Sequence, residues 1–230
     1  MKTVGIIGGL GPETTAKFYL EIVFGCYKKN KENRPPILIW NVPLKYKIEE
    51  DVLKNAIGEE KNIPYLIEAA KRLERAGTDF LVMPCNTLHI FIDEIRKSVK
   101  IPILSIVEET VKFLKDKNIS KVGLLATTTT IKRKLYETAL ERENIKQILP
   151  NKNDQDKLGE IVSNIVLNKY SNKDKKEIAE IIEKNFENKG VDCVILACTD
   201  LQNLIKKYPN ITIYDTMDIF ADATVNNILG

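Results

Sequence analysis

Short apolar runs alternate regularly with longer stretches of helical spacing along this chain. In the first half, apolar runs predict strands at residues 4–7, 37–40, 80–83 and 101–104. The stretches between them predict helices, among them residues 13–29, 63–76 and 87–99. Alternation of this kind is typical of a parallel sheet with helices wound on both of its faces.

The second half repeats the first in the same order. Residues 121–125 parallel residues 2–7, residues 193–200 parallel residues 80–87, and residues 211–215 parallel residues 101–105. We therefore expect an α/β protein of two similar lobes, each a four-stranded parallel sheet flanked by helices, related by a pseudo-two-fold duplication.

The lobe boundaries follow from this repeat. Residues 1–105 are expected to form the first lobe, completed by the C-terminal helix 216–230, and residues 106–215 the second lobe. Helices at 108–117 and 218–229 are expected to cross between the lobes. A ligand site is then expected in the cleft between the two sheet edges.

Two segments end a buried apolar run with a cysteine that is followed at once by small polar residues. The first cysteine segment, residues 80–87, contains Cys85, and the second cysteine segment, residues 193–200, contains Cys198. Open α/β sheets bind their ligands at the carboxyl ends of the strands. The pattern therefore predicts two thiols that face one small molecule.

The remaining cysteines and the single histidine indicate other roles. Cys26 lies within a predicted helix and Cys193 within a predicted strand, where a small buried hydrophobic side chain is the favoured interpretation. The cysteines form no Cys-x-x-Cys pair, and His89 is the chain's one histidine. A zinc site would need an unusual ligand set, so no metal is expected.

Composition excludes several classes of protein. The chain is 43% hydrophobic and 29% charged, as is ordinary for a globular protein, and its apolar runs are far shorter than the ~20 residues that span a bilayer. Because 35 Lys and Arg nearly balance 32 Asp and Glu, nucleic-acid binding gains no support. With no signal peptide ahead of the first strand, we expect a cytoplasmic protein that binds neither nucleic acid nor membrane.

The glycine-rich turn after the first strand suggests a nucleotide site, but the pattern fails in detail. A dinucleotide motif starting at Gly9 lacks its last glycine, and Pro12 removes an amide that would face phosphate. We interpret the turn as a place where backbone approaches a small carboxylate, with a purely structural turn as the alternative. Residues 127–130, four threonines, occupy the equivalent turn of the second lobe. These hydroxyls can cap a helix or bind a carboxylate, and because one hydroxyl suffices for the cap, we expect at least one of them to contact substrate.

Four segments together carry a family resemblance. Residues 5–12, 83–89, 124–128 and 197–200 are similar to the aspartate/glutamate racemase family, and most similar to its aspartate racemase branch. The resemblance covers nearly the whole chain in the right order. It implies a cofactor-independent amino acid racemase, an isomerase acting on a free small-molecule amino acid, with a homodimer as the expected assembly.

The resemblance also implies a mechanism and a set of site residues. Cys85 and Cys198 would be catalytic, on opposite faces of Cα, with Cys198 facing the α-hydrogen of the L-isomer and Cys85 that of the D-isomer. A helix N-terminus can lower a cysteine pKa into the ~3.5–7.5 range, which would supply a thiolate. The residues expected to bind substrate are Gly9, Leu10, Asn86, Thr87, Thr127, Thr128, Thr130 and Thr199. His89 is open to a structural role or an acid–base role.

Departures from the family pattern bear on the substrate. Aspartate racemases of this kind usually place an Arg shortly after the second strand to hold the distal carboxylate, whereas this chain has Lys45-Tyr46-Lys47-Ile48. A second cation is usual near Leu167, where only Lys169 is close by. Lysine lacks the bidentate fork of arginine. Ala197 and Asp200 replace the usual Gly and Glu, and neither change should disturb the thiols.

Three functions stay open on these grounds. The leading one is interconversion of L- and D-aspartate or glutamate by two thiols. The alternative is a related enzyme of the superfamily, such as a broad-specificity amino acid racemase, a hydantoin racemase or a maleate isomerase. The third is a binding module without turnover, which paired thiols at both edges disfavour.

Overall fold

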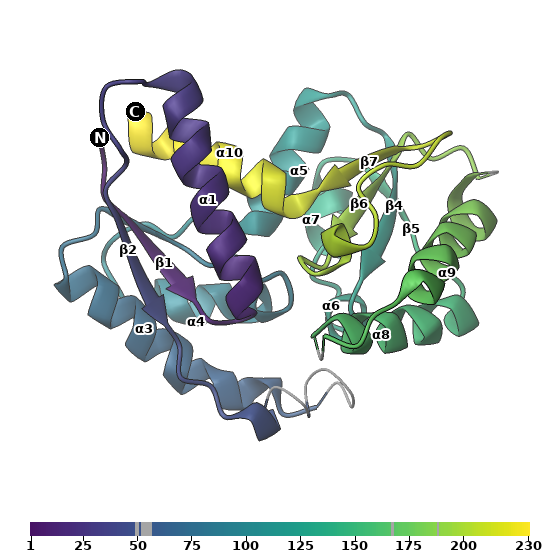
Figure 1. Cartoon of the computed structure of the whole chain (residues 1–230), viewed down its shortest axis with the longest axis horizontal. Helices are drawn as coiled ribbons and strands as arrows, with labels where there is room; N and C mark the ends of the chain where they lie inside the picture. Colours follow the sequence, from purple (N-terminus) through teal and green to yellow (C-terminus); the bar gives the residue numbers. More distant parts are fainter. Residues whose placement is uncertain (49–50, 52–56, 167, 188) are drawn as a thin grey trace.

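The computed structural model describes residues 1–48, 51, 57–166, 168–187 and 189–230. Within these ranges the chain forms two parallel sheets, one in each lobe (Figure 1). The first sheet has the order β2-β1-β3 and the second the order β5-β4-β6-β7. The strands are β1 (Val4–Gly8), β2 (Ile37–Asn41), β3 (Phe80–Val82), β4 (Lys121–Ala126), β5 (Lys146–Ile148), β6 (Cys193–Ala197) and β7 (Thr212–Asp215).

Helices cover both faces of both sheets. The α-helices are α1 (Pro12–Lys29), α3 (Ile63–Arg75), α4 (Ile92–Arg96), α5 (Ile106–Asp116), α6 (Thr128–Lys132), α7 (Glu137–Arg142), α8 (Lys152–Val166), α9 (Asn172–Ile182) and α10 (Thr216–Leu229). Shorter turns are η1 (Glu59–Asn62), η2 (Thr87–Phe91), η3 (Glu183–Glu187) and η4 (Leu201–Asn203). None of the described helices is long and apolar enough to cross a membrane.

The helices divide into outer and central layers. Apolar residues of α3 and α4 form one core with the first sheet, and residues of α8 and α9 form another with the second sheet. A third core lies between the sheets and includes residues of α1, α5 and α10. Figure 1 shows α10 (yellow) running from the second sheet to a position beside α1. The central layer therefore joins the two lobes.

The strands that lead to the predicted site are apolar on both faces. All residues of β1 and β6 are buried, which is typical of parallel strands with helices on both sides. In each lobe the first strand pairs with the strand of the cysteine segment, β1 with β3 and β4 with β6. The two-lobed α/β fold with parallel sheets is thus confirmed, including this repeated pairing.

The first sheet nevertheless has three described strands where four were predicted. Residues 101–104 make only an isolated parallel bridge between Ile103 and Leu81. Pro102 has no N–H to extend a ladder, and Ser105 then caps α5 by accepting a hydrogen bond from the Glu108 N–H. The segment occupies the place that β7 holds in the second sheet, but it is too short to count as a strand.

The helix predicted at residues 87–99 is also different. The chain instead forms the 3₁₀ turn η2 and then the short helix α4. His89 lies in η2, and its imidazole forms hydrogen bonds with the backbone of Cys85 before this turn and of Ile106 after it. The side chain therefore fixes the turn. The lobe boundaries at 105 and 215 stay predictions.

Candidate active site

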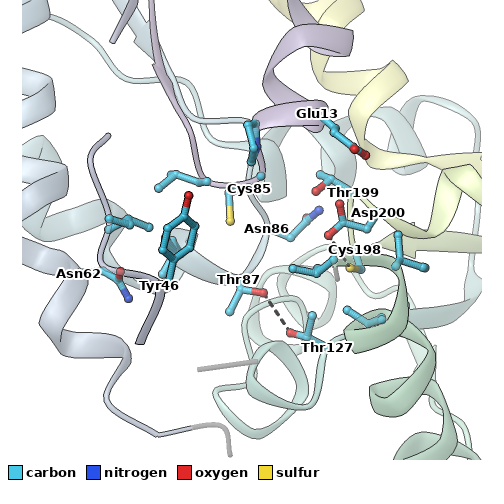
Figure 2. A pocket seen from close by; sticks show the side chains of 18 residues that line it. Glu13, Tyr46, Asn62, Cys85, Asn86, Thr87, Thr127, Cys198, Thr199 and Asp200 are labelled. Atoms are coloured by element: carbon cyan, nitrogen blue, oxygen red, sulfur yellow. Dashed lines mark hydrogen bonds between the residues drawn. The ribbon is translucent and has the colours of Figure 1, made fainter. Parts of the chain in front are cut away.

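A cavity of about 450 Å³ lies where the carboxyl ends of the two sheets face each other. Cys85 follows β3 and Cys198 follows β6, and both line this one cavity. Figure 2 shows the two cysteines, from different lobes, among the side chains that line it. All four cysteines of the chain are thiols, and none is joined in a disulfide.

The backbone around Cys85 is fixed by hydrogen bonds on both sides. Its N–H donates to the Met83 carbonyl at 2.8 Å, and its own carbonyl accepts from His89 Nδ1 at 2.7 Å. On the other side of the imidazole, Nε2 accepts from the Ile106 N–H at 3.1 Å. His89 thereby ties the first cysteine segment to the start of α5.

This arrangement requires a neutral imidazole, with one nitrogen as donor and the other as acceptor. His89 is 1% exposed, and burial lowers its pKa from 6.5 to about 4. Of the two roles left open by the sequence, the structure supports the structural one. His89 orients the backbone at Cys85 and is not among the described residues that line the cavity.

Asn86 is held by a buried chain of hydrogen bonds that crosses between the lobes. The Tyr136 hydroxyl donates to Asn86 Oδ1 at 2.5 Å, and Asn86 Nδ2 donates to Thr216 Oγ1 at 3.0 Å. Thr216 in turn donates to the Leu196 carbonyl at 2.8 Å, two residues before Cys198. The two cysteine segments are therefore linked through side chains that fix their relative position.

Three threonine hydroxyls meet beside the cavity and form a hydroxyl cluster of Thr87, Thr127 and Thr130. Thr87 Oγ1 lies 3.0 Å from Thr127 Oγ1 (Figure 2). Thr130 Oγ1 lies 3.3 Å from Thr87 Oγ1 and 2.9 Å from Thr127 Oγ1. Thr127 also caps α6 by accepting from the Thr130 N–H at 3.2 Å. Thr87 and Thr127 line the cavity, so their hydroxyls can turn toward a carboxylate there.

The glycine turn brings only part of its backbone to the cavity. Leu10 lines it, but Gly9 is not among the described lining residues, and the Gly9 N–H donates to Thr15 Oγ1 at 3.0 Å. Gly9 has a φ of +80°, and a Cβ there would lie 2.7 Å from Asn41 Oδ1. The turn thus needs glycine for its own geometry and for close approach to the loop after β2.

Cys198 lies deeper than Cys85. Its side chain is 4% exposed, whereas that of Cys85 is half-buried. Cys198 Sγ donates a long hydrogen bond to Asp200 Oδ2 at 3.9 Å. Burial, and then the negative charge of Asp200, raise the Cys198 pKa well above the ordinary value of a thiol, so this residue rests as the neutral S–H.

Asp200 is itself an unusual carboxyl group. It accepts a hydrogen bond from Thr14 Oγ1 at 3.2 Å, which joins α1 of the first lobe to the second cysteine segment. Burial raises the Asp200 pKa, and the charge of Glu13 raises it further. A carboxyl group of raised pKa next to a buried thiol can exchange a proton with it.

The expectation that a helix N-terminus lowers a thiol pKa is wrong for Cys198. The element after it is the three-residue 3₁₀ turn η4, and no α-helix begins there. Desolvation of the buried thiol exceeds any stabilisation from the few amides of that turn. Cys85 likewise precedes a 3₁₀ turn, η2.

Apolar side chains line the rest of the cavity from two directions. The loop wall consists of Leu44 and Tyr46, which follow β2, and the helix wall consists of Val162, Ile165 and Val166 on α8. Both lie in regions where the sequence analysis looked for cations. Lys45, Lys47 and Lys169 are not among the described lining residues, Lys47 pairs with Asp51 at 2.8 Å, and Leu167 lies outside the described residues.

The structure brings together most of the predicted site. Besides the two cysteines, five predicted binding residues line the cavity: Leu10, Asn86, Thr87, Thr127 and Thr199. Gly9, Thr128 and Thr130 are not among its described lining residues, although Thr130 supports Thr87 and Thr127. Whether each residue contacts substrate stays a prediction.

Sequence reasoning did not assign to the site the carboxylate of Glu13, the amide of Asn62 or the helix wall. The sequence signal that could have found Glu13 is its position in the first turn of α1, directly after Pro12. The residues of the helix wall have ordinary helical spacing, which indicates core packing.

Cys26 and Cys193 are fully buried in the central core, as predicted. Among the described residues, no group of three or more His, Cys, Asp or Glu could hold a metal ion.

Comparison with known proteins gives a consistent result. The family model for Asp/Glu/Hydantoin racemase matches residues 7–224. The chain is 28% identical to the broad specificity amino-acid racemase RacX of Bacillus subtilis, over 99% of this chain and 98% of that protein.

Solved structures agree in fold over the whole length. An aspartate racemase from Picrophilus torridus has a TM-score of 0.82 at 25% identity, covering 99% of this chain and 94% of that one. An aspartate racemase homologue from Pyrococcus horikoshii OT3 has a TM-score of 0.80 at 28% identity, with both chains fully covered.

Proposed function

This chain belongs to the Asp/Glu/Hydantoin racemase family, and we propose that it inverts Cα of a free amino acid with the thiols of Cys85 and Cys198. The chain is an isomerase of the amino acid racemase type. One observation carries the two-thiol mechanism: a cysteine from each lobe lines the same cavity at the carboxyl ends of two parallel sheets.

The proposed reaction transfers one proton at each face of Cα. The Cys85 thiolate removes the α-proton and becomes a thiol, while the electron pair of the broken C–H bond moves toward the substrate α-carboxylate. The Cys198 S–H then gives its proton to the opposite face of Cα and becomes a thiolate. The product has the inverted configuration, and the protons balance.

The protonation state of Cys198 favours this direction from the resting enzyme. Cys198 rests as the S–H because its pKa is raised, and the half-buried Cys85 is the more exposed of the two thiols. The resting enzyme is then ready for the enantiomer whose α-hydrogen faces Cys85, which by family resemblance is the D-isomer. After turnover, Cys85 would release its proton to water, and Asp200 would relay a proton from water to the Cys198 thiolate, ending again as a carboxylate.

Substrate groups have suitable partners at the thiol end of the cavity. Hydroxyls of Thr87 and Thr127 would donate to the α-carboxylate, where negative charge grows as the α-proton leaves. The carboxylates of Glu13 and Asp200 would attract the α-ammonium. Together these contacts would hold Cα between the two sulfur atoms.

Aspartate or glutamate was the leading prediction for the substrate, and it stays a prediction. The apolar loop and helix walls support the broader alternative, an amino acid racemase that is not confined to acidic substrates. The similarity to RacX, named for broad specificity, agrees with that alternative.

The test is proton exchange at Cα in heavy water. Incubation of the enzyme with a panel of L- and D-amino acids should remove the α-proton NMR signal of at least one of them and generate its enantiomer. Cys85→Ser and Cys198→Ser should each reduce racemisation by about a thousandfold, within the range expected for loss of an acid–base group. Cys26→Ser, which alters a buried thiol outside the cavity, is the matched control and should retain exchange.

Two outcomes would contradict this proposal. Turnover of a hydantoin or of maleate, with no exchange of any amino acid, would favour the alternative enzymes of the superfamily. Racemisation that survives both cysteine substitutions would exclude the two-thiol mechanism.

A further inference from the structure

The charges that line the cavity lie at its thiol end. Its two described charged lining residues are both carboxylates, Glu13 and Asp200. Asp200 accepts from Cys198 Sγ, and Glu13 is close enough to raise the Asp200 pKa. These groups suit the α-ammonium of a substrate, and they repel any second carboxylate that comes near.

Away from the thiol end, the cavity is mostly apolar and is built by both lobes. The loop wall comes from the first lobe, and the helix wall comes from the second. Val162 and Ile165 also belong to the core that contains Cys198, with exposures of 3% and 4%. A substrate side chain that extends away from the thiol end would therefore contact the buried helix wall on one side and the loop wall, Leu44 and Tyr46, on the other.

We infer that this cavity selects amino acids with an uncharged, largely apolar side chain, of about the size of methionine or leucine. The inference rests on the proposed racemase function and adds the substrate class. A volume of about 450 Å³ lies in the range of small-molecule sites and leaves room for such a side chain beyond Cα. Tyr46, which is 88% exposed, would cover the side chain at the mouth.

A side-chain carboxylate would be disfavoured for two physical reasons. Placed against the helix wall it would lose its hydration without gaining a partner, and this cost is large for an ion. An apolar side chain in the same position would instead gain the transfer free energy of its buried surface. The difference favours methionine over the nearly isosteric glutamate.

The side-chain oxygen of Asn62 also disfavours a substrate with a side-chain carboxylate. Asn62 lines the cavity and is 2% exposed, and its Nδ2 donates to the Glu59 carbonyl at 3.0 Å. That bond fixes the amide so that Oδ1, a buried acceptor without a hydrogen-bond partner, is the free end. An acceptor cannot pair with a carboxylate, because a carboxylate offers no donor.

The experiment compares substrates of similar size by exchange at Cα in heavy water. The wild-type enzyme is given both enantiomers of methionine, leucine, glutamate, aspartate and ornithine, and kcat/KM is measured for each. We expect kcat/KM for methionine or leucine to exceed that for each charged substrate by at least about tenfold. Equal or faster exchange of glutamate, aspartate or ornithine would overturn the inference and leave the proposed racemase function intact. Exchange of none of the five would overturn the inference, and the wider amino acid panel then decides whether the proposed racemase function fails as well.

A positive charge placed in the helix wall should shift the preference toward glutamate. In Val166→Arg, at a half-buried lining position, the ratio of glutamate to methionine kcat/KM should rise by at least about tenfold. Val166→Leu, which keeps the wall apolar, and Glu160→Arg, which adds a cation on the exposed side of α8, should leave the ratio unchanged.

A fallback keeps the test decisive if Val166→Arg fails to fold, as judged by thermal unfolding. Tyr46→Arg alters an exposed residue at the cavity mouth and should shift the ratio in the same direction. No shift in a folded variant of either kind would contradict the assignment of these walls to the side-chain pocket.

Discussion

The two cysteine segments follow the same pattern in the sequence, yet the two thiols have different surroundings. Cys85 is half-buried, and the groups that fix its segment are neutral, namely the His89 imidazole and the Asn86 amide. Cys198 is almost fully buried, and its Sγ donates to the Asp200 carboxyl group. One lobe thus holds its cysteine with neutral hydrogen bonds, and the other places a charge beside it.

Under the proposed mechanism, this difference would let a duplicated fold support an asymmetric proton transfer. The repeated strand pairing, β1 with β3 and β4 with β6, brings a cysteine to the same edge in each lobe. The surroundings of each thiol are then set by side chains that the repeat does not share. Glu13 and Thr14 reach Asp200 from α1, whereas Tyr136 and Thr216 reach Asn86 from the second lobe and α10.

The neutral side of the comparison can be tested through His89, for which we expect the largest effect on stability. Its pKa is lowered from 6.5 to about 4, so the unfolded chain takes up a proton at pH values where the folded chain does not. Stability should therefore be lost as the pH falls from 6.5 to 4, by about 3 kcal/mol from this group. Urea unfolding of wild type and His89→Gln across this window isolates its contribution.

The same prediction has a direct spectroscopic check. His89 is the only histidine in the chain, so its ring protons can be followed by NMR without ambiguity. A midpoint close to 4 is expected. A midpoint near 6.5 would mean that the imidazole is not locked between the Cys85 carbonyl and the Ile106 N–H.

The charged side is tested by Asp200→Asn, which removes the carboxyl group beside Cys198 and keeps its shape. We expect kcat/KM for racemisation to fall by about a hundredfold, since an amide cannot exchange a proton with the thiol. Because the Asp200 charge raises the Cys198 pKa, the thiolate of the variant should form at lower pH than in wild type. Alkylation of Cys198 as a function of pH measures this shift.

The conservative variant separates a chemical role from a structural one. Asp200→Glu keeps the carboxyl group and should restore most of the activity. If Asp200→Asn retains full activity and its alkylation profile is unmoved, Asp200 takes no part in the protonation of Cys198.

Much of the fold could be predicted because its signals are local. The apolar runs of β1 and β6, the proline at the start of α1 and the cysteines at strand ends each follow from neighbouring residues. The strand predicted at 101–104 failed because Pro102 and the early start of α5 limit it to one bridge. Periodicity alone does not reveal where a following helix begins.

The site could be predicted only in part because its chemistry depends on contacts between distant residues. The hydroxyl cluster joins Thr87 to Thr127 and Thr130 across the lobes, and of these three only Thr87 and Thr127 line the cavity. The residues of the helix wall have the spacing of ordinary core positions, so nothing local marks them as part of a site. Assembly as a homodimer stays a prediction.

The smallest expected effect concerns the chain of hydrogen bonds that links the two segments. Tyr136→Phe removes the donor to Asn86 Oδ1 and leaves a buried acceptor unpaired, which costs about 1 kcal/mol. The melting temperature should therefore fall by about 2–4 °C. Tyr170→Phe, at a 42% exposed position, is the matched control and should change it little. If kcat/KM also falls while KM is unchanged, the link sets the relative position of the thiols. If the melting temperatures of the two variants are equal, the Tyr136 hydroxyl contributes no net stability, and Asn86 must be held in place by Thr216 alone.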